Sequence, residues 1–494
     1  MKQKNIIIAF ISLACISACS VKETHSDDPL AGSNDPQTNI EQPAPITSVT
    51  PAPAPKAEDL LNFFPQGTDQ LKVLCARPGN DRVRALFCLN GLPHPAAPAI
   101  TSLVQLRNAL GLNIDDAGVG FALTGHSSSL VSRQTNSINP RAVFFHKSPN
   151  VVPNYASLGF VPGEQLVEIA TKDASNPNPN TNVKFFLVAF KQACNNTPQG
   201  CTHGDLLGTS IQNNWVATSI YEAEDLKNTQ LDCLQCHQPQ GPNSPRILRM
   251  QELQIPWTHW MFTKTPGGQA LLSDFAAARA NETYASIPAA RIAESDPETM
   301  EVFIRQAGFA NQPNEFLSAQ VETEVQASAP QQPIVNIPFG QSNTWEALFA
   351  NFLSGTVIRP PYHDVKVTDP VKLNANTMAY RDFVNGTISG AQLPDIRESH
   401  FEPQMWAMGY KMKPGSTPQQ LLMQACGQCH NQRLDQSLSR ARFNVDLTQM
   451  SRAQKDAAIA RLNLQEDHLF SMPPKRFMEL NAFERAAIKN LLEQ

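Results

Sequence analysis

Two short segments place two thiols and an imidazole at the same spacing. Cys233-Leu-Gln-Cys236-His237 and Cys426-Gly-Gln-Cys429-His430 both have the pattern Cys-x-x-Cys-His. Paired thiols at this distance serve three kinds of chemistry. They can exchange with disulfides, bind zinc, or attach a porphyrin through thioether bonds.

The histidine that follows each pair favours haem. In c-type attachment the thiols add to the porphyrin vinyl groups, and the next histidine becomes the proximal ligand of iron. A redox dithiol does not need that histidine. A zinc ribbon made from two pairs, with Cys236 and Cys429 lying 193 residues apart, would leave both histidines unexplained. We therefore expect two covalently bound haem c groups, with His237 and His430 as axial ligands.

Helix-capping signals surround the second motif. The capping residues are Thr417 or Ser416 before Pro418, Ser451 with Gln454, and Asn481 with Glu484. Between the last two helices that these signals predict, Met472 precedes Pro473 and Pro474 in a loop. The order is therefore helix, Cys-x-x-Cys-His, helix, Met-Pro loop and terminal helix.

Over residues from about 415 to 494 this order resembles the small class I cytochromes c. The resemblance implies an all-α domain in which Met472 is the distal iron ligand, and a Met/His pair raises the reduction potential. His468 is the rival distal ligand, and a core position is the other role open to Met472. Three arginines could contact haem propionates, although a surface position is the default for each: Arg440, Arg442 and Arg461.

The first motif has no Met-Pro loop at a similar distance. The candidate distal ligands are Met250, His259 and Met261 nearby, and His126, His146, His203 and His363 farther away. His259 follows His237 by 22 residues, which resembles the low-potential haem of bacterial dihaem peroxidases. That resemblance implies His259 as the axial ligand, flanked by Trp257 and Trp260. Core packing of His259 between these tryptophans is the alternative.

The chain begins with an export signal. Lys2 and Lys4 precede an apolar run over residues 6–16, which is too short to span a bilayer as a helix. The end of this segment, Ile-Ser-Ala-Cys19, resembles the lipobox of bacterial lipoproteins. The resemblance implies a signal peptide over residues 1–18 and a lipid anchor on Cys19, and the alternative is an ordinary signal peptide in which Cys19 has no such role. Because Ser20 rather than Asp follows, it also implies the outer membrane, facing the periplasm or the cell surface.

Four of the ten cysteines remain when Cys15, Cys19 and the four motif cysteines are set aside, since Cys15 leaves with the signal peptide. They are Cys75, Cys88, Cys194 and Cys201. Export into an oxidising compartment favours disulfides. Nearest-neighbour pairing predicts Cys75–Cys88 and Cys194–Cys201, although other pairings of the four are open.

The remaining chain predicts an α+β protein in four parts. Residues 19–57 are rich in Pro and Ala and form a disordered tether. Residues 58–225 form an α+β module, 226–410 a loop-rich helical region with the first haem, and 411–494 an all-α domain. The predicted elements are a helix from Ser102, strands over 141–145, 164–170 and 183–190, and helices over 267–280 and 299–310. The Gly118-x-Gly120 pair lacks a third glycine, so we expect no nucleotide site.

The run INPRAVFF, with LGFVPGEQLVEIA and KFFLVAF after it, resembles uncharacterised secreted bacterial cytochromes. The resemblance implies a sheet packed against the first haem. Arg141 is a candidate for a buried or propionate-facing charge in such a sheet, and a surface role is the alternative.

A net charge of −5 without any basic run argues against nucleic acid as a partner. We expect single-electron transfer between redox proteins at the cell envelope. The alternative is a peroxidase-like or oxygenase-like enzyme with an open site at the first haem, although the flanking sequence does not reproduce the peroxidase pattern. A surface module that uses haem structurally is a third class.

Overall fold

The computed structural model describes a large part of the chain in separate stretches. These are residues 64–125, 135, 138–227, 231–238, 243–248, 266–279, 282–304, 320, 324, 327, 342–354, 370–389, 392–394, 411–427, 429–430, 444–465, 471–474 and 478–494. Helices and strands both occur there, as the α+β prediction requires. The predicted signal peptide, Cys19 and the tether lie outside the described residues.

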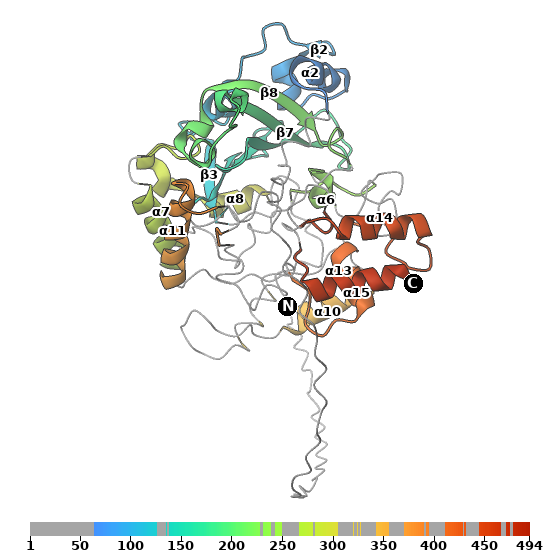
Figure 1. The fold of residues 1–494 in the computed structure, drawn as a ribbon. Helices are drawn as coiled ribbons and strands as arrows, with labels where there is room; N and C mark the ends of the chain where they lie inside the picture. The colour runs from blue at the N-terminus through green and yellow to red at the C-terminus, as the bar shows by residue number, and fades with distance from the viewer. Residues whose placement is uncertain are drawn as a thin grey trace, which may run out of the picture. The chain divides into compact units, whose positions relative to one another are not determined.

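The centre of the N-terminal part is a six-stranded antiparallel sheet in which the strands follow chain order (Figure 1). Its strands are β3 (Val119–Thr124), β4 (Arg141–His146), β5 (Ala156–Phe160), β6 (Leu166–Lys172), β7 (Val183–Gln192) and β8 (Trp215–Glu222). Nearly every residue of β3 to β7 is buried. Burial on both faces of an antiparallel sheet indicates that other elements cover both of them.

The two faces of the sheet border different hydrophobic cores. In β4, Ala142 and Phe144 join the larger core, while Val143 and Phe145 join a second one. This division follows from the alternation of side chains along a strand. We call the side of Phe144 the first face and the side of Phe145 the second face.

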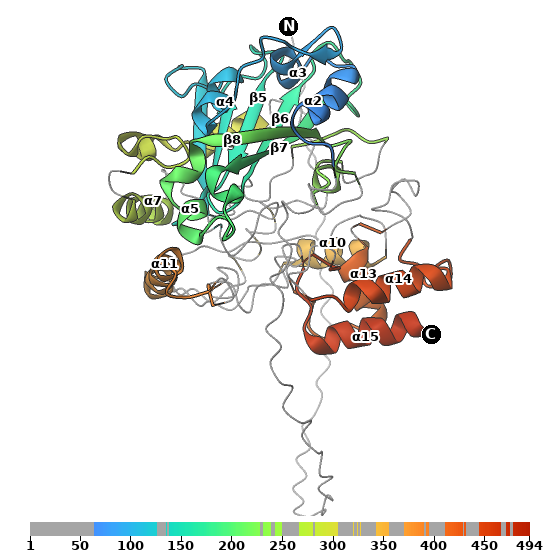
Figure 2. The same ribbon diagram turned by 45° about the horizontal axis from the view of Figure 1, so that its top comes forward.

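Short helices cover the first face (Figure 2). They are α2 (Gly67–Ala76), α3 (Arg82–Phe87) and α4 (Leu103–Ala109), with the small hairpin β1 (Cys88–Leu89) and β2 (Leu92–Pro93) between them. The Asp81 side chain caps α3, and the Ser102 side chain caps α4. The structure contains both predicted disulfides, with Cα–Cα distances of 5.3 Å for Cys75–Cys88 and 4.8 Å for Cys194–Cys201.

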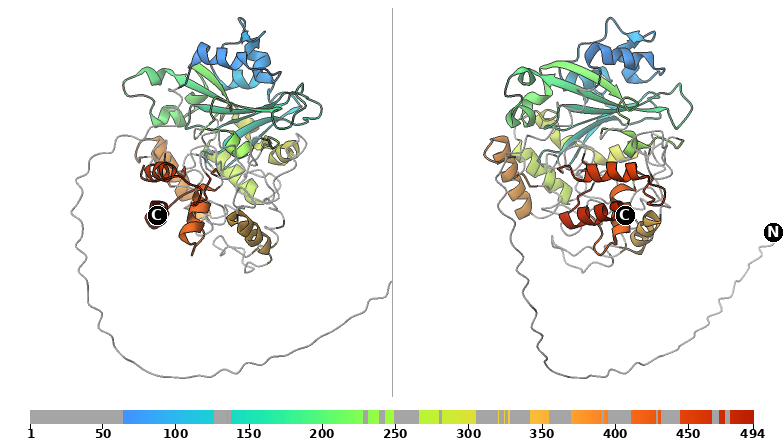
Figure 3. Two further views of the ribbon diagram at one scale, coloured as in Figure 1. Left: turned by 90° about the vertical axis from the view of Figure 1, so that its right-hand side faces the viewer. Right: turned by 45° about the vertical axis from the view of Figure 1, so that its right-hand side comes forward.

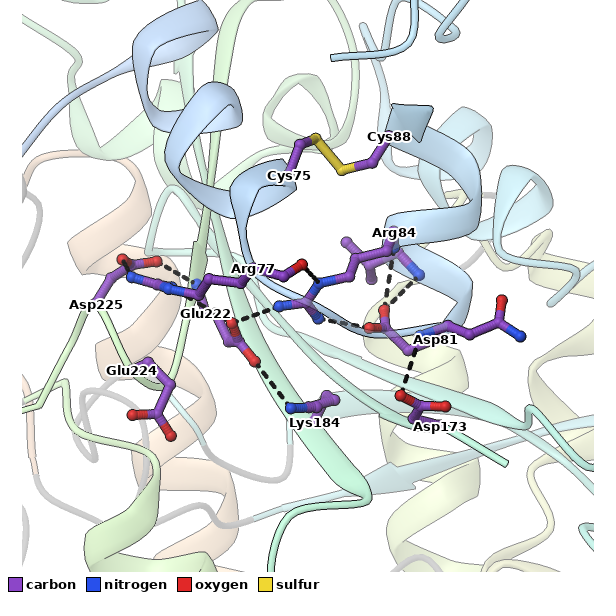
Figure 4. A network of polar contacts seen from close by, with 12 residues as sticks. Cys75, Arg77, Asp81, Arg84, Cys88, Asp173, Lys184, Glu222, Glu224 and Asp225 are labelled. Atoms are coloured by element: carbon purple, nitrogen blue, oxygen red, sulfur yellow. Dashed lines mark hydrogen bonds and ion pairs between the residues drawn. A yellow bond between two sulfur atoms is a disulfide. The ribbon is translucent and has the colours of Figure 1, made fainter. Parts of the chain in front are cut away.

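A network of buried charges ties the loop between α2 and α3 to β8 (Figure 4). Arg84 lies 2.6 Å from Asp81 and 2.6 Å from Glu222, and all three side chains are almost fully buried. Arg77 and Lys184 also approach Glu222, at 3.3 Å and 3.5 Å. Burial lowers the pKa of Arg84, but the charges of Glu222 and Asp81 outweigh it, and the pKa rises above its ordinary value. Arg84 therefore stays charged inside the protein.

Further helices lie between β7 and β8 or follow β8 along the chain. They are η1 (Ala193–Asn196), α5 (His203–Leu207), η2 (Thr209–Gln212), α6 (Leu234–His237), α7 (Pro266–Ala278), η4 (Ala289–Glu294), α8 (Pro297–Ile304), α10 (Asn343–Leu353) and α11 (Pro370–Val384). Among these, α8 packs on the second face, because Met300 and Phe303 belong to the same core as Phe145. The helices α7 and α8 overlap the segments 267–280 and 299–310, for which periodicity predicts helices, and each begins one or two residues earlier.

The described residues from 411 onward contain α13 (Pro418–Cys426), α14 (Arg452–Leu462) and α15 (Ala482–Glu493), and no strand (Figure 3). Their apolar faces form one core that includes Leu422, Leu462 and Leu492. All three predicted N-caps are confirmed as capping boxes, with Thr417 rather than Ser416 at the first. Within the described residues, no helix has both the length and the apolar character needed to cross a bilayer.

Candidate haem-binding sites

The first Cys-x-x-Cys-His motif lies in and just before the short helix α6. The Asp232 carboxylate accepts a hydrogen bond at 3.0 Å from the N–H of Leu234, the first residue of the helix. The His237 N–H donates to the Cys233 carbonyl at 3.0 Å, and the His237 carbonyl accepts from the Ile247 N–H at 2.8 Å. These bonds fix the histidine one helical turn after the first cysteine.

The ring of His237 is held on two sides. Its Nδ1 lies 2.9 Å from the Ile247 carbonyl oxygen, which can only accept, so Nδ1 carries the proton and donates. Its ring stacks on Phe185 of β7, with centroids 4.2 Å apart and planes inclined by 13°. Since Nδ1 is protonated in the neutral ring, Nε2 is the nitrogen with a lone pair for a metal.

The motif packs on the second face of the sheet. Leu234 and Ile247 share a core with Phe145 and Phe185, and Cys233 packs against it. Cys233 also contacts a neighbouring cluster that contains Leu187. A sheet packed against the first motif is the arrangement that the resemblance to secreted cytochromes implies.

The second motif follows the capped helix α13. The His430 N–H donates to the Cys426 carbonyl at 2.8 Å, and the His430 carbonyl accepts from the Val445 N–H at 3.0 Å. The residue after Cys426 must be a glycine, because a Cβ on Gly427 would lie 2.6 Å from the Met423 carbonyl oxygen. The equivalent position in the first motif is Leu234, so this glycine answers a local need of the second site.

Burial sets the protonation of the second motif. Desolvation lowers the pKa of His430 to about 4, which keeps its imidazole neutral near pH 7. Desolvation, with a smaller contribution from Cys429, raises the pKa of Cys426 to about 12. A neutral imidazole is the form that ligates iron.

Both motifs thus share one backbone arrangement. In each, the histidine N–H donates to the carbonyl of the first cysteine, and the histidine carbonyl accepts from an aliphatic residue later in the chain. That residue is Ile247 in the first motif and Val445 in the second. We call this arrangement the histidine clasp. The two clasps are built by different folds, one on a sheet and one in a helical core.

Met472 lies in the loop after α14. Its N–H donates to the Arg461 carbonyl at 3.4 Å, next to the end of that helix. Ser471 and Pro473 on either side are buried, and Met472 itself is partly buried. Arg461 contributes this carbonyl contact from its backbone, and its predicted propionate contact stays a prediction. Ligation of the second haem by Met472 also stays a prediction.

Two of the distant histidines are described. His146 points to the first face, where its Nδ1 accepts from the Ala156 N–H at 3.0 Å, so it lies on the opposite side of the sheet from His237. His203 begins α5, and its ring lies 4.0 Å from that of Phe383. Neither arrangement places these histidines at the first motif.

The other candidates lie outside the described residues. They are the side chain of Cys236, Met250, Trp257, His259, Trp260, Met261, His126, His363, His468, Arg440 and Arg442. Within the described residues, the thiols outside the two disulfides belong to Cys233, Cys426 and Cys429. No group of three or more His, Cys, Asp or Glu residues in the described stretches is placed to hold a metal ion.

No protein-family model, no curated protein and no solved structure matches the chain. The function must therefore be argued from the residues themselves.

Proposed function

We propose that this chain is a dihaem c-type cytochrome that transfers single electrons at the bacterial cell envelope. The observation that carries the proposal is the histidine clasp, which recurs at Cys233–His237 and at Cys426–His430. A dithiol exchange site or a zinc site needs no fixed histidine directly after its second cysteine. A proximal iron ligand does need one.

The chain's residues fit the group that the motifs require. His237 keeps its proton on Nδ1 by donating to the Ile247 carbonyl, which leaves Nε2 available as a ligand. At the second site, the lowered pKa of His430 keeps its imidazole neutral near pH 7, the form that can ligate iron. The bound haem supplies a one-electron iron couple, and the protein controls its potential and its access to partners.

The rest of the proposal concerns the surroundings of the two haems. The C-terminal residues are proposed to form a class I cytochrome c-like domain with Met472 as the distal ligand, and His259 is proposed as the second ligand of the first haem. Lipidation at Cys19 would anchor the protein to the outer membrane, with the tether giving it reach toward redox partners. The order of capped helices around the second motif supports the first of these points.

Spectra of single-motif variants test the proposal. The full chain would be matured in a host that attaches haem, and Cys233→Ala/Cys236→Ala would be compared with Cys426→Ala/Cys429→Ala. Each pair of substitutions should remove one of two haem couples in a redox titration. The proposal is wrong if neither variant loses a couple.

Reactivity with small ligands distinguishes electron transfer from catalysis. An electron carrier with both irons six-coordinate should give low-spin spectra and stay inert to peroxide, cyanide and carbon monoxide. A high-spin band together with peroxide turnover would instead favour the enzyme, because catalysis needs an open or displaceable distal position.

A further inference from the structure

Arg141 is a buried cation on the second face of the sheet. It begins β4, its residue is 7% exposed, and one terminal nitrogen pairs with the Glu168 carboxylate of β6. Its Nε is also buried and has no hydrogen-bond partner within the part of the chain that the structure describes. A buried N–H without an acceptor is costly, so this donor is expected to meet an acceptor in the mature protein.

A glycine makes room for this arginine. A Cβ on Gly159 of β5 would lie 2.9 Å from Arg141 Nε and 3.0 Å from its Cζ, so any larger residue would displace the guanidinium. The Arg141 side chain therefore crosses β5 over Gly159 on its way to Glu168. The strand register places Glu168 opposite both Gly159 and Leu187. The side chain thus extends from β4 toward β7, the strand that carries Phe185.

The first motif occupies the same face nearby. Phe185, which stacks on His237, lies two residues before Leu187 in β7, so both side chains are on the same face. Cys233 packs with Leu187 in one apolar cluster. The Arg141–Glu168 pair therefore lies on the same sheet face as Phe185 and Leu187, the residues that contact the two ends of the first motif.

The protonation of His237 indicates the side on which its metal-binding nitrogen lies. Nδ1 faces Ile247, whose neighbour Arg246 donates to the Val183 carbonyl at the start of β7. Nε2 is on the other side of the ring and faces away from that segment. Along β7, Val183 and Leu187 lie on opposite sides of Phe185, and Glu168 pairs with Leu187. The Arg141–Glu168 pair is thus on the side away from Arg246.

We infer that Arg141 binds a propionate carboxylate of the first haem through its unpartnered Nε–H, with Glu168 holding the guanidinium in place. Arginine suits this role because its planar group can serve two carboxylates at once. This inference rests on the proposed function, since it assigns a residue to the haem that the first motif would bind.

A fixed cation beside the first haem makes reduction of its iron easier, because the electron that is added is attracted to it. Arg141→Gln should therefore lower the reduction potential of the first haem. We expect about a tenfold change in its reduction equilibrium, which is about 59 mV for one electron. Glu168→Gln should shift the same potential upward, and Arg141→Lys should restore much of the wild-type value. The potential of the second haem should stay constant in all three variants.

Arg107→Gln is the matched control. Arg107 is another buried arginine, 3% exposed, but it lies over the ring of Phe144 on the first face. Its replacement should lower thermal stability without changing either potential. Arg246→Gln tests the alternative that Arg246, next to Ile247, is the arginine that binds the propionate.

The experiment is a redox titration of the full, haem-loaded chain, followed by visible spectra and paired with thermal unfolding of each variant. The inference is overturned if Arg141→Gln folds and leaves the first potential unchanged, or if only Arg246→Gln changes it. If Arg141→Gln does not fold, an unchanged potential in Glu168→Gln overturns it instead. A chain that binds no haem at all contradicts the proposed function, whereas a dihaem chain with these unchanged potentials contradicts only the assignment of Arg141.

Discussion

His237 and the backbone of Ile247 are joined by two hydrogen bonds that run in opposite directions, one from the imidazole ring and one to the His237 backbone carbonyl. The ring Nδ1–H donates to the Ile247 carbonyl at 2.9 Å, and the Ile247 N–H donates to the His237 carbonyl at 2.8 Å. A ligand held in this way is fixed both in ring orientation and in tautomer. Such support from outside the ligand set commonly tunes a metal ligand.

Ile247→Pro removes the N–H donor of this pair and keeps the carbonyl acceptor. We expect the free energy of unfolding to fall by about 0.5–1.5 kcal/mol, because the carbonyl of the half-buried His237 loses its partner. The low-spin signal of the first haem in electron paramagnetic resonance should broaden, while that of the second stays sharp. Ile247→Val keeps both backbone bonds and should leave the two signals as they are. Equal signals in the proline and valine variants would contradict this role.

Met472→Ala tests the predicted distal ligand of the second haem. The sulfur-to-iron charge-transfer band should disappear, and the potential of that haem should fall, because thioether ligation favours ferrous iron. Near-infrared absorption of the oxidised protein measures the band. Met378→Ala is a control, because Met378 is 58% exposed on α11. A band that persists in Met472→Ala would assign the ligand to another residue.

Glu222→Gln tests the buried charge network of Figure 4. The change removes the β8 carboxylate that pairs with Arg84 of α3 in a buried setting, so we expect a loss of about 3–5 kcal/mol in the free energy of unfolding. Lys72→Met breaks the exposed pair with Asp69, whose side chains are 62% and 75% exposed, and should cost at most about 1 kcal/mol. Urea unfolding measures both. Similar losses in the two variants would show that the network contributes little.

The stability of the N-terminal part should decrease in acid through Asp173. Burial raises the pKa of Asp173, but hydrogen bonds from Ser175 and from the Asn80 N–H outweigh it, and the pKa lies below its ordinary value. The folded state therefore binds a proton less readily than the unfolded state. The resulting stabilisation is present above the ordinary pKa of 3.8 and is lost as the pH falls through the lowered value.

Asp173→Asn should make the free energy of unfolding less dependent on pH below about 4. Ser175→Ala removes the hydroxyl that donates to Asp173, and it should reduce the pH dependence of the free energy of unfolding by a smaller amount. Urea titrations at a series of pH values provide the measurement. An acid dependence that is the same in Asp173→Asn as in the wild type would rule out this carboxylate as its source.

The elements that sequence patterns predicted well are those with local signals. The capping boxes at Thr417, Ser451 and Asn481 depend on residues three positions apart, and all three form. The strands β4, β6 and β7 have runs of β-branched and aromatic residues. Their predicted bounds differ from the observed ones by a few residues at most.

Other strands were missed because glycine or polar residues interrupt them. Gly120 interrupts the apolar run of β3, and a Cβ added there would lie 2.8 Å from the Phe145 ring, which packs across the glycine. Gly159 in β5 similarly leaves space for Arg141. The helix α11 begins at Pro370, a residue type that is compatible both with a loop and with a first helical turn. For Gly120 and Gly159, the residue that explains the glycine is distant in the sequence. For Pro370, the residue type fits both a loop and a helix start.

In the candidate site, too, contacts between residues that are distant in the sequence could not be predicted. The cysteines and histidines of both motifs were evident from their spacing alone. Phe185 and the Ile247 carbonyl were not, since stacking and a backbone acceptor leave no spacing signal in one sequence. The strand over 183–190 was expected, but its register against His237 depends on the tertiary fold.

Covalent attachment of haem to the four motif cysteines is the central claim, and acid–acetone extraction of the mature protein tests it most directly. The full chain should keep its colour in the precipitated polypeptide, and its intact mass should exceed that of the processed, lipidated polypeptide by two haem groups. A polypeptide that comes out colourless, with all haem in the acetone phase or none at all, would contradict the account.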